Sequence, residues 1–232
     1  MTELPSTAIQ PKAAPLSAWS RGQALAMAAA LLGCACWHAA WPVALCALPS
    51  FACLLWLGRG RFTPSGRFGL ANAVTTLRLC LLLTLTAPAS VLPSLRALAL
   101  VSVVMLLDLL DGWSARARGD ASAFGAHFDM ETDALLVLLL TLRLWLVAGF
   151  GAWVLCSGLL RYLYVLWLWL WPGTGREAPR SLFGRLAFAS LVLGLCSGLV
   201  LPGVWATSGV VLGTLIVSWS FARSGYFSRL AS

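Results

Sequence analysis

Long apolar runs fill most of this 232-residue chain, and their lengths decide what the chain can fold into. Proline, glycine or charged residues bound each run, and a helix needs about 20 apolar residues to cross a bilayer, with a floor near 17. The runs occupy residues 24–57, 70–87, 93–110, 131–148, 153–171, 183–200 and 204–220. At 60% hydrophobic residues, the chain is also more apolar than soluble proteins, whose apolar share is about 45–50%. The sequence therefore predicts an all-α integral membrane protein.

The first of these runs is too long for a single span. As one helix at about 1.5 Å per residue it would extend some 50 Å, whereas the hydrocarbon core is about 30 Å thick. The segment HAAWP at 38–42 is expected to turn the chain, which gives about eight spans in all. We divide the chain into a tail at 1–22, a transmembrane hairpin at 23–58 and a six-helix core bundle at 59–232.

The basic residues predict an orientation in the membrane. If the N-terminal tail, which does not resemble a cleaved signal peptide, lies in the cytosol, the arginine-bearing loops all fall on the same side. Their arginines are Arg59, Arg61, Arg67, Arg116, Arg118, Arg176, Arg180, Arg223 and Arg229. The alternate loops, at 39–41, 88–92, 149–152 and 201–203, contain no lysine or arginine, although Arg96 follows one of them closely. We therefore expect a multi-pass protein of the bacterial inner membrane.

The formal net charge of +8 does not indicate a nucleic-acid-binding protein. Its basic residues are nearly all arginines at the ends of apolar runs, without the clustered stripe that nucleic-acid binding needs. Anionic membrane lipids are the expected partners of these arginines.

Six of the eight acidic residues lie in the window DLLDGWSARARGDASAFGAHFDMETD, from Asp108 to Asp133. Asp108 and Asp111 are three apart and Asp129 and Asp133 four apart, so each pair shares one face of its helix. Two antiparallel helices can then direct four carboxylates at one point near the cytosolic surface. So much negative charge in a low-dielectric site needs cations, and carboxylates without cysteine or paired histidine ligands favour Mg²⁺ or Mn²⁺ over zinc.

The spacing of this window is more specific than its charge. It reads D-x2-D-G-x2-A-R-x8-G-x3-D-x3-D, and its fixed positions are Asp108, Asp111, Gly112, Ala115, Arg116, Gly125, Asp129 and Asp133. This pattern resembles the signature of the CDP-alcohol phosphotransferase family. Upstream, LANAVTTLR, with Asn72, Thr75 and Arg78, resembles the family's first core helix. The resemblance covers about residues 65–221, makes 59–232 the catalytic domain, and leaves the hairpin outside the six-helix core.

This resemblance implies a membrane transferase of phospholipid biosynthesis. Such an enzyme moves a phosphatidyl or other phospho-alcohol group from a CDP-linked donor to a small alcohol acceptor and releases CMP. We expect CDP-diacylglycerol as the donor, because its acyl chains can stay in the lipid. By resemblance, two Mg²⁺ or Mn²⁺ ions are held by Asp108, Asp111, Asp129 and Asp133, and Asp133 is the favoured general base. The resemblance also assigns nucleotide binding to Asn72, Thr75, Gly112, Ala115, Arg116 and Gly125.

Two arginines lie inside predicted spans and should face the bundle interior, because an unpaired charge in lipid is costly. Arg143 and Arg161 are each either a counter-ion for an internal aspartate or a binding group for a substrate phosphate. For Arg161 we favour binding of an anionic acceptor, since the predicted spans place no acid at a comparable depth. Glu131 lies outside the signature and is expected in solvent or a local ion pair. We expect His127 to be a hydrogen-bonded packing residue.

Two other function classes also use acidic residues in membranes. An aromatic prenyltransferase would ordinarily present two aspartate-rich motifs in separate helical halves, whereas this chain has one. A divalent-cation transporter would carry its acids near mid-bilayer on several helices, whereas these cluster at one face. A second copy of the chain, forming a homodimer, is a further candidate partner.

Overall fold

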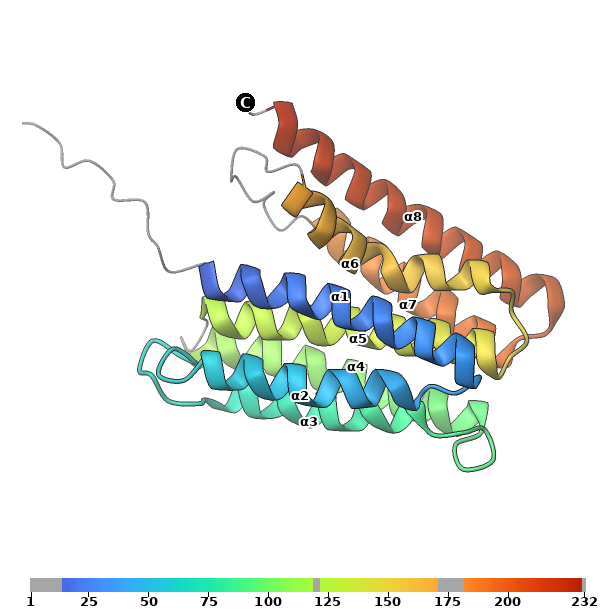
Figure 1. The fold of residues 1–232 in the computed structure, drawn as a ribbon, viewed down its shortest axis with the longest axis horizontal. Coiled ribbons are helices and arrows are strands. Elements are labelled where there is room, and N and C mark those ends of the chain that lie inside the picture. The colour runs from blue at the N-terminus through green and yellow to red at the C-terminus, as the bar shows by residue number, and fades with distance from the viewer. Residues whose placement is uncertain (1–13, 119–121, 171–181, 231–232) are drawn as a thin grey trace, which may run out of the picture.

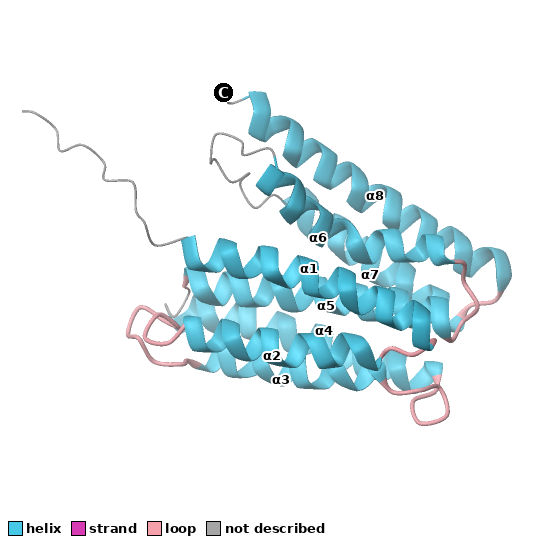
Figure 2. Ribbon diagram, in the orientation of Figure 1, coloured by secondary structure: helices cyan, strands magenta, loops and turns pink. Residues whose placement is uncertain are grey.

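The computed structural model describes residues 14–118, 122–170 and 182–230, without the side chains of residues 14, 110–118, 182 and 224–230. Every regular element in this part of the chain is helical, as Figures 1 and 2 show, and the all-α prediction is confirmed. The helices are α1 (Ala14–Trp37), α2 (Trp41–Leu57), α3 (Leu70–Leu83), η1 (Thr84–Thr86), α4 (Ser94–Arg118), α5 (Ala123–Leu146), η2 (Ala152–Val154), α6 (Leu155–Leu170), α7 (Leu182–Val200) and α8 (Gly203–Leu230).

The predicted turn after the first helix is present. α1 ends at Trp37, His38 has a positive φ of 47°, and α2 begins at Trp41 with Pro42 in its first turn. Proline fits this position because its missing N–H has no helical partner there. The helices α1 and α2 therefore form the expected hairpin.

The two helices that carry the acidic window extend beyond their apolar runs. α4 continues to Arg118 and α5 begins at Ala123, because helical hydrogen bonding does not require apolar side chains. Ser122 caps α5: its Oγ accepts a hydrogen bond from the Gly125 N–H at 2.9 Å. The polar window is thus mostly helical, with a short connection between the two helices.

Three helical segments of the described chain are long and apolar enough to cross a membrane: Ala152–Leu170, Phe183–Val200 and Gly203–Arg223. Trp41–Leu57 and Leu70–Thr86 are shorter apolar helices. Large apolar side chains are exposed on several helices, among them Leu186, Leu193, Trp205, Leu212 and Trp219. Exposure on this scale suits a lipid environment. The count of eight spans and the division into three segments remain predictions.

α5 is the central helix, and its position fixes where the acids lie. It packs against α3, α6 and α7, and its residues from Ala134 to Leu144 are buried. α6 reaches α5 closely because Gly158 lies against Thr141 and Leu138. α7 and α8 pack tightly where Gly194 faces the carbonyl oxygen of Gly209. The second half of α5 is therefore enclosed by the bundle, and Asp129 and Asp133 lie just before this enclosed part.

Arg143 contacts backbone carbonyl groups in the described part of the chain. Its Nη1 donates to the carbonyl oxygens of Leu85 at 3.1 Å and Ala87 at 2.9 Å, and its Nη2 donates to that of Leu92. These carbonyl oxygens lie at and after the end of η1, where carbonyl groups no longer have a helical N–H group as a hydrogen-bond donor. Arg143 therefore holds the connection between α3 and α4, and among the described residues it pairs with backbone carbonyls and not with an aspartate.

Candidate functional site

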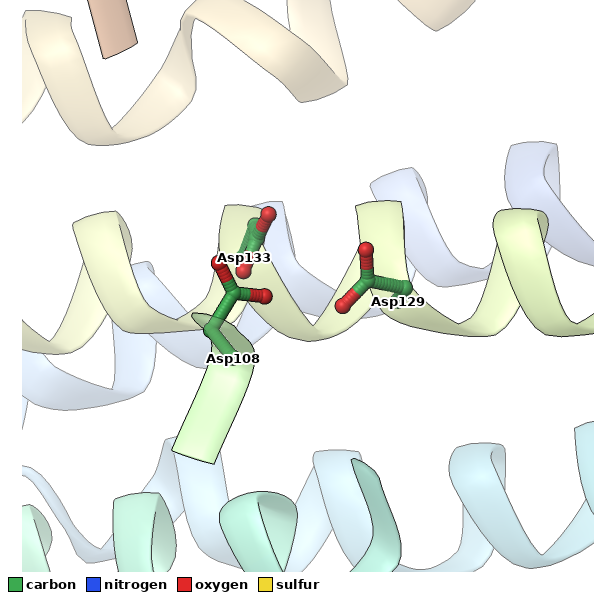
Figure 3. A group of neighbouring side chains, drawn as sticks. All are labelled: Asp108, Asp129 and Asp133. Carbon is green, nitrogen blue, oxygen red and sulfur yellow. The ribbon is translucent and has the colours of Figure 1, made fainter. Parts of the chain in front are cut away.

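Three carboxylates from two helices converge inside the bundle (Figure 3). Asp108 comes from α4, and Asp129 and Asp133 lie one turn apart on α5. Each offers one oxygen, and these oxygens all lie within 4.8 Å of one another. The side chains are 25%, 40% and 22% exposed, respectively, so the cluster can be reached from outside. The structure thus brings together three acids of the predicted quartet; the side chain of Asp111 lies outside the described residues.

A buried arginine lies against all three carboxylates. Arg78 of α3 has a side chain with 0% exposure, and its Nη1 is 2.8 Å from Oδ1 of Asp108 and 2.6 Å from Oδ1 of Asp129. Its Nη2 is 2.7 Å from Oδ1 of Asp133. Each ion pair uses the Oδ1 atom, so the second oxygen of each carboxylate makes none of these contacts. One guanidinium thus orients three acids from the buried side of the cluster.

Sequence reasoning noted Arg78 in the LANAVTTLR segment but gave it no site role. The available signal was its spacing from Asn72 and Thr75, since residues three apart share a helix face. All three are buried, with exposures of 2% for Asn72, 3% for Thr75 and 0% for Arg78. A polar, buried face on an otherwise apolar helix therefore indicated a site.

Asn72 connects this face of α3 to the start of α5. Its Nδ2 donates to the carbonyl oxygens of Phe62 at 3.0 Å and Phe68 at 2.6 Å, and Ser122 Oγ donates to the same Phe62 oxygen at 2.6 Å. A Cβ added to Gly125 would come within 3.1 Å of Asn72 Oδ1. Glycine therefore allows α5 to lie directly against Asn72.

The other predicted nucleotide-binding residues are only partly described. Thr75 Oγ1 donates to the Ala71 carbonyl oxygen at 3.0 Å, within its own helix. Gly112, Ala115 and Arg116 belong to α4, but no side-chain contacts are described there. The structure therefore places Asn72 and Thr75 on the buried face of α3 that carries Arg78, with Gly125 against Asn72, and leaves the α4 positions as a prediction.

Glu131 lies between the two aspartates of α5 and is 1% exposed, so of the two expected settings, solvent or an ion pair, the ion pair is the one found. Arg161 Nη2 of α6 donates to Glu131 Oε1 at 2.8 Å, and Ser20 Oγ of α1 donates to the same oxygen at 3.2 Å. The ion pair joins two helices. His127 Nε2 is 3.1 Å from Ser20 Oγ, and its ring packs edge-on against Trp19, as expected for a packing residue.

The expectation that no acid lies at the depth of Arg161 was wrong. Glu131 is eight residues after the first residue of α5, and Arg161 is nine residues before the last residue of α6. At about 1.5 Å per residue these offsets are roughly 12 and 14 Å from adjacent helix ends. The error arose because the apolar run begins at 131 whereas the helix begins at 123.

A small cavity opens beside the cluster. Its volume is about 140 Å³, and its walls come from α5, α6, α7 and α8. Asp133, Arg161 and Ser157 are among its polar residues, and Phe188 and Leu191 are among its apolar ones. Since a water molecule occupies about 30 Å³ in the liquid, the space holds a group of roughly five waters. The cavity can therefore admit a small polar molecule next to Asp133.

An apolar helical bundle with a carboxylate cluster and an adjoining cavity defines a membrane-associated protein suited to binding a cation and a small polar ligand. The family model for CDP-alcohol phosphatidyltransferase matches residues 68–221, and the chain belongs to this family. The predicted family is thus confirmed, and the chain is a phosphotransferase enzyme. Its apolar helices and its family indicate a multi-pass membrane protein. Searches of curated proteins and of solved structures gave no significant match.

Proposed function

We propose that this protein transfers a phosphatidyl group from CDP-diacylglycerol to a hydroxyl group of a small anionic alcohol, with release of CMP, in phospholipid biosynthesis. One observation carries the proposal: in a member of this family, carboxylates from α4 and α5 converge within 4.8 Å of one another beside a small cavity.

The donor atoms of the cluster fit a divalent cation. They are carboxylate oxygens, which Mg²⁺ and Mn²⁺ prefer, and the second oxygens of Asp108, Asp129 and Asp133 are not used by the Arg78 ion pairs. With Asp111 as a fourth ligand, we propose that the site holds two ions. When bound, such ions neutralise the diphosphate of the donor and make the phosphorus more electrophilic.

The chain's own residues orient the reactants. Asp133 lines the cavity and also belongs to the cluster, so it can accept the proton of an acceptor hydroxyl positioned there. The acceptor oxygen forms a bond to the phosphorus bearing the diacylglycerol, and the bond from that phosphorus to the bridging oxygen breaks. CMP leaves with the electron pair of the broken bond. Arg78 holds the three carboxylates in place throughout.

The remaining assignments concern the substrates. We propose that Asn72, Thr75, Gly112, Ala115, Arg116 and Gly125 form the nucleotide site. Arg161 lines the cavity with Asp133 and uses its Nη2 for Glu131, and we propose that its remaining donors bind an anionic group of the acceptor. The cavity of about 140 Å³ can hold a small polar group of the acceptor beside Asp133.

The test is a transfer assay. Purified protein is incubated with radiolabelled CDP-diacylglycerol, Mg²⁺ and a panel of alcohols comprising glycerol 3-phosphate, serine, choline and an inositol phosphate. We expect a labelled lipid product with a small anionic acceptor, and none after chelation of the metal with EDTA. Product with choline alone would contradict the anionic acceptor, and no product with any member would contradict the donor.

We also propose that the protein lies in the bacterial inner membrane with the carboxylate site facing the cytosol. In a background without native cysteines, single cysteines at Ser90 and Gly151 should react with an impermeant thiol reagent in intact cells. A cysteine at Ser65, in the arginine-bearing loop, should react only after the membrane is opened. Reaction at Ser65 in intact cells would reverse the orientation. The homodimer stays an untested prediction.

A further inference from the structure

We infer that Glu131 is a positioning residue that holds the Arg161 guanidinium away from Asp133 and thereby leaves the Asp133 carboxylate available to a divalent cation. The inference rests on the proposed function, since it takes the carboxylate cluster to be a metal site. Glu131 itself is outside the metal-binding signature, and its described contacts are with Arg161, Ser20 and His127.

The first support is the position of Glu131 on α5. It lies two residues after Asp129 and two before Asp133, and on a helix such a residue projects from a different face. Its side chain is 1% exposed and is held from two other helices, by Arg161 at 2.8 Å and Ser20 at 3.2 Å. These contacts restrict the rotation of α5 about its own axis. The direction in which Asp129 and Asp133 point is therefore tied to the Glu131 contacts.

The second support is the shared cavity. Arg161 and Asp133 line the same space of about 140 Å³, and they are the charged residues in its wall. An arginine inside the bundle needs a partner, either an anion or, as for Arg143, backbone carbonyl oxygens, because an unpaired buried charge is strongly unfavourable. Glu131 supplies that partner in the structure. Without the Glu131 charge, Asp133 is the carboxylate that shares the cavity wall with Arg161.

A movement of the Arg161 guanidinium toward Asp133 would affect cation binding, because Asp133 already has a cationic neighbour. Its Oδ1 accepts from Arg78 Nη2 at 2.7 Å, which leaves its second oxygen for a metal ion. A second guanidinium on that oxygen would compete directly with the ion. Since both competitors are attracted to the same carboxylate, the affinity of the site for a divalent cation should fall.

The third support comes from the N-terminal hairpin, which lies outside the residues 68–221 that match the family. Ser20 of α1 donates to Glu131 and lies 3.1 Å from His127 Nε2. α1 also packs against α6, the helix that carries Arg161. The hairpin thus contributes to the placement of Glu131, and this gives α1 a role in the site.

The experiment measures binding of Mn²⁺ to the purified full-length protein in detergent by electron paramagnetic resonance, without substrates. Glu131→Gln should weaken Mn²⁺ binding about tenfold, because the neutral amide no longer holds the Arg161 charge. The double variant Glu131→Gln, Arg161→Ala should restore the wild-type affinity to within about threefold, since no guanidinium can then reach Asp133, although the ion pair between α5 and α6 is also lost. Ser20→Ala should weaken binding by a smaller factor. Arg96→Gln removes a positive charge from an exposed position and should leave the affinity unchanged.

The double variant separates this idea from a purely structural role. If Glu131 only stabilised the packing of α5 and α6, removing both partners would not restore Mn²⁺ affinity. Unchanged affinity in Glu131→Gln, or a double variant as weak as the single one, would overturn the inference. If Glu131→Gln fails to fold, Arg161→Gln alone still tests it: removal of the competing guanidinium should not weaken Mn²⁺ binding, and a tenfold loss would overturn the inference. Wild-type protein that binds no Mn²⁺ would instead refute the metal site itself.

Discussion

Replacing Asp129 by asparagine is expected to lower transfer activity about a thousandfold while the protein remains folded in the membrane. The change removes one anionic oxygen ligand from the cluster and nearly preserves the shape of the side chain. A thousandfold loss corresponds to about 4 kcal/mol of transition-state stabilisation, which is within what a metal-bound diphosphate contributes. The measurement is kcat for lipid product at saturating Mg²⁺, with size-exclusion chromatography as the check on folding.

A matched variant shows whether any acid in this window would have the same effect. Asp120 lies in the same stretch of sequence but outside the signature spacing. Asp120→Asn should therefore retain activity close to that of the wild type. Near-wild-type activity in Asp129→Asn would remove Asp129 from the site, and an equal loss in both variants would show that the window acts only through its overall charge.

The helices could be predicted from the sequence because lipid imposes a simple rule on length and polarity. Apolar runs separated by proline, glycine and arginine give the order of the helices, including the turn at 38–42. The rule fails at helix ends that carry polar residues, as in α4 and α5. A polar segment can continue a helix wherever its side chains reach water or other side chains, so apolar length understates helix length.

The convergence of the aspartates could be predicted from spacing alone, because Asp129 and Asp133 are one helical turn apart and α4 and α5 are joined by a short connection. The partners of the buried arginines could not be predicted in this way. Arg161 pairs with Glu131 across 30 residues of sequence, and Arg143 binds the backbone carbonyls of another segment. Such contacts depend on the relative height and rotation of helices, which periodicity does not specify.

Arg78 illustrates the same limit and leads to the second large effect. Arg78→Met is expected to destabilise the protein by roughly 3–5 kcal/mol in the absence of metal, the typical result of leaving buried charges without their partner. Three carboxylates would remain close together without the guanidinium that now lies between 2.6 and 2.8 Å from each. A divalent cation should offset part of this loss, because it supplies positive charge to the same carboxylates. Arg78→Lys, which keeps the charge but loses the planar fork, should fall between wild type and Arg78→Met.

The measurement is the thermal unfolding midpoint of each variant in EDTA and in excess Mg²⁺, and Arg143 provides the matched control. Both arginines are buried, with exposures of 0% for Arg78 and 2% for Arg143, but the described contacts of Arg143 are to backbone carbonyls. Arg143→Met should therefore destabilise the protein, and Mg²⁺ should raise the unfolding midpoint of this variant no more than it raises that of the wild type. Mg²⁺ should raise the midpoint of Arg78→Met more than that of the wild type, because the variant has more uncompensated negative charge at the cluster. Equal responses to Mg²⁺ in both methionine variants would show that Arg78 and the cation do not act on the same carboxylates.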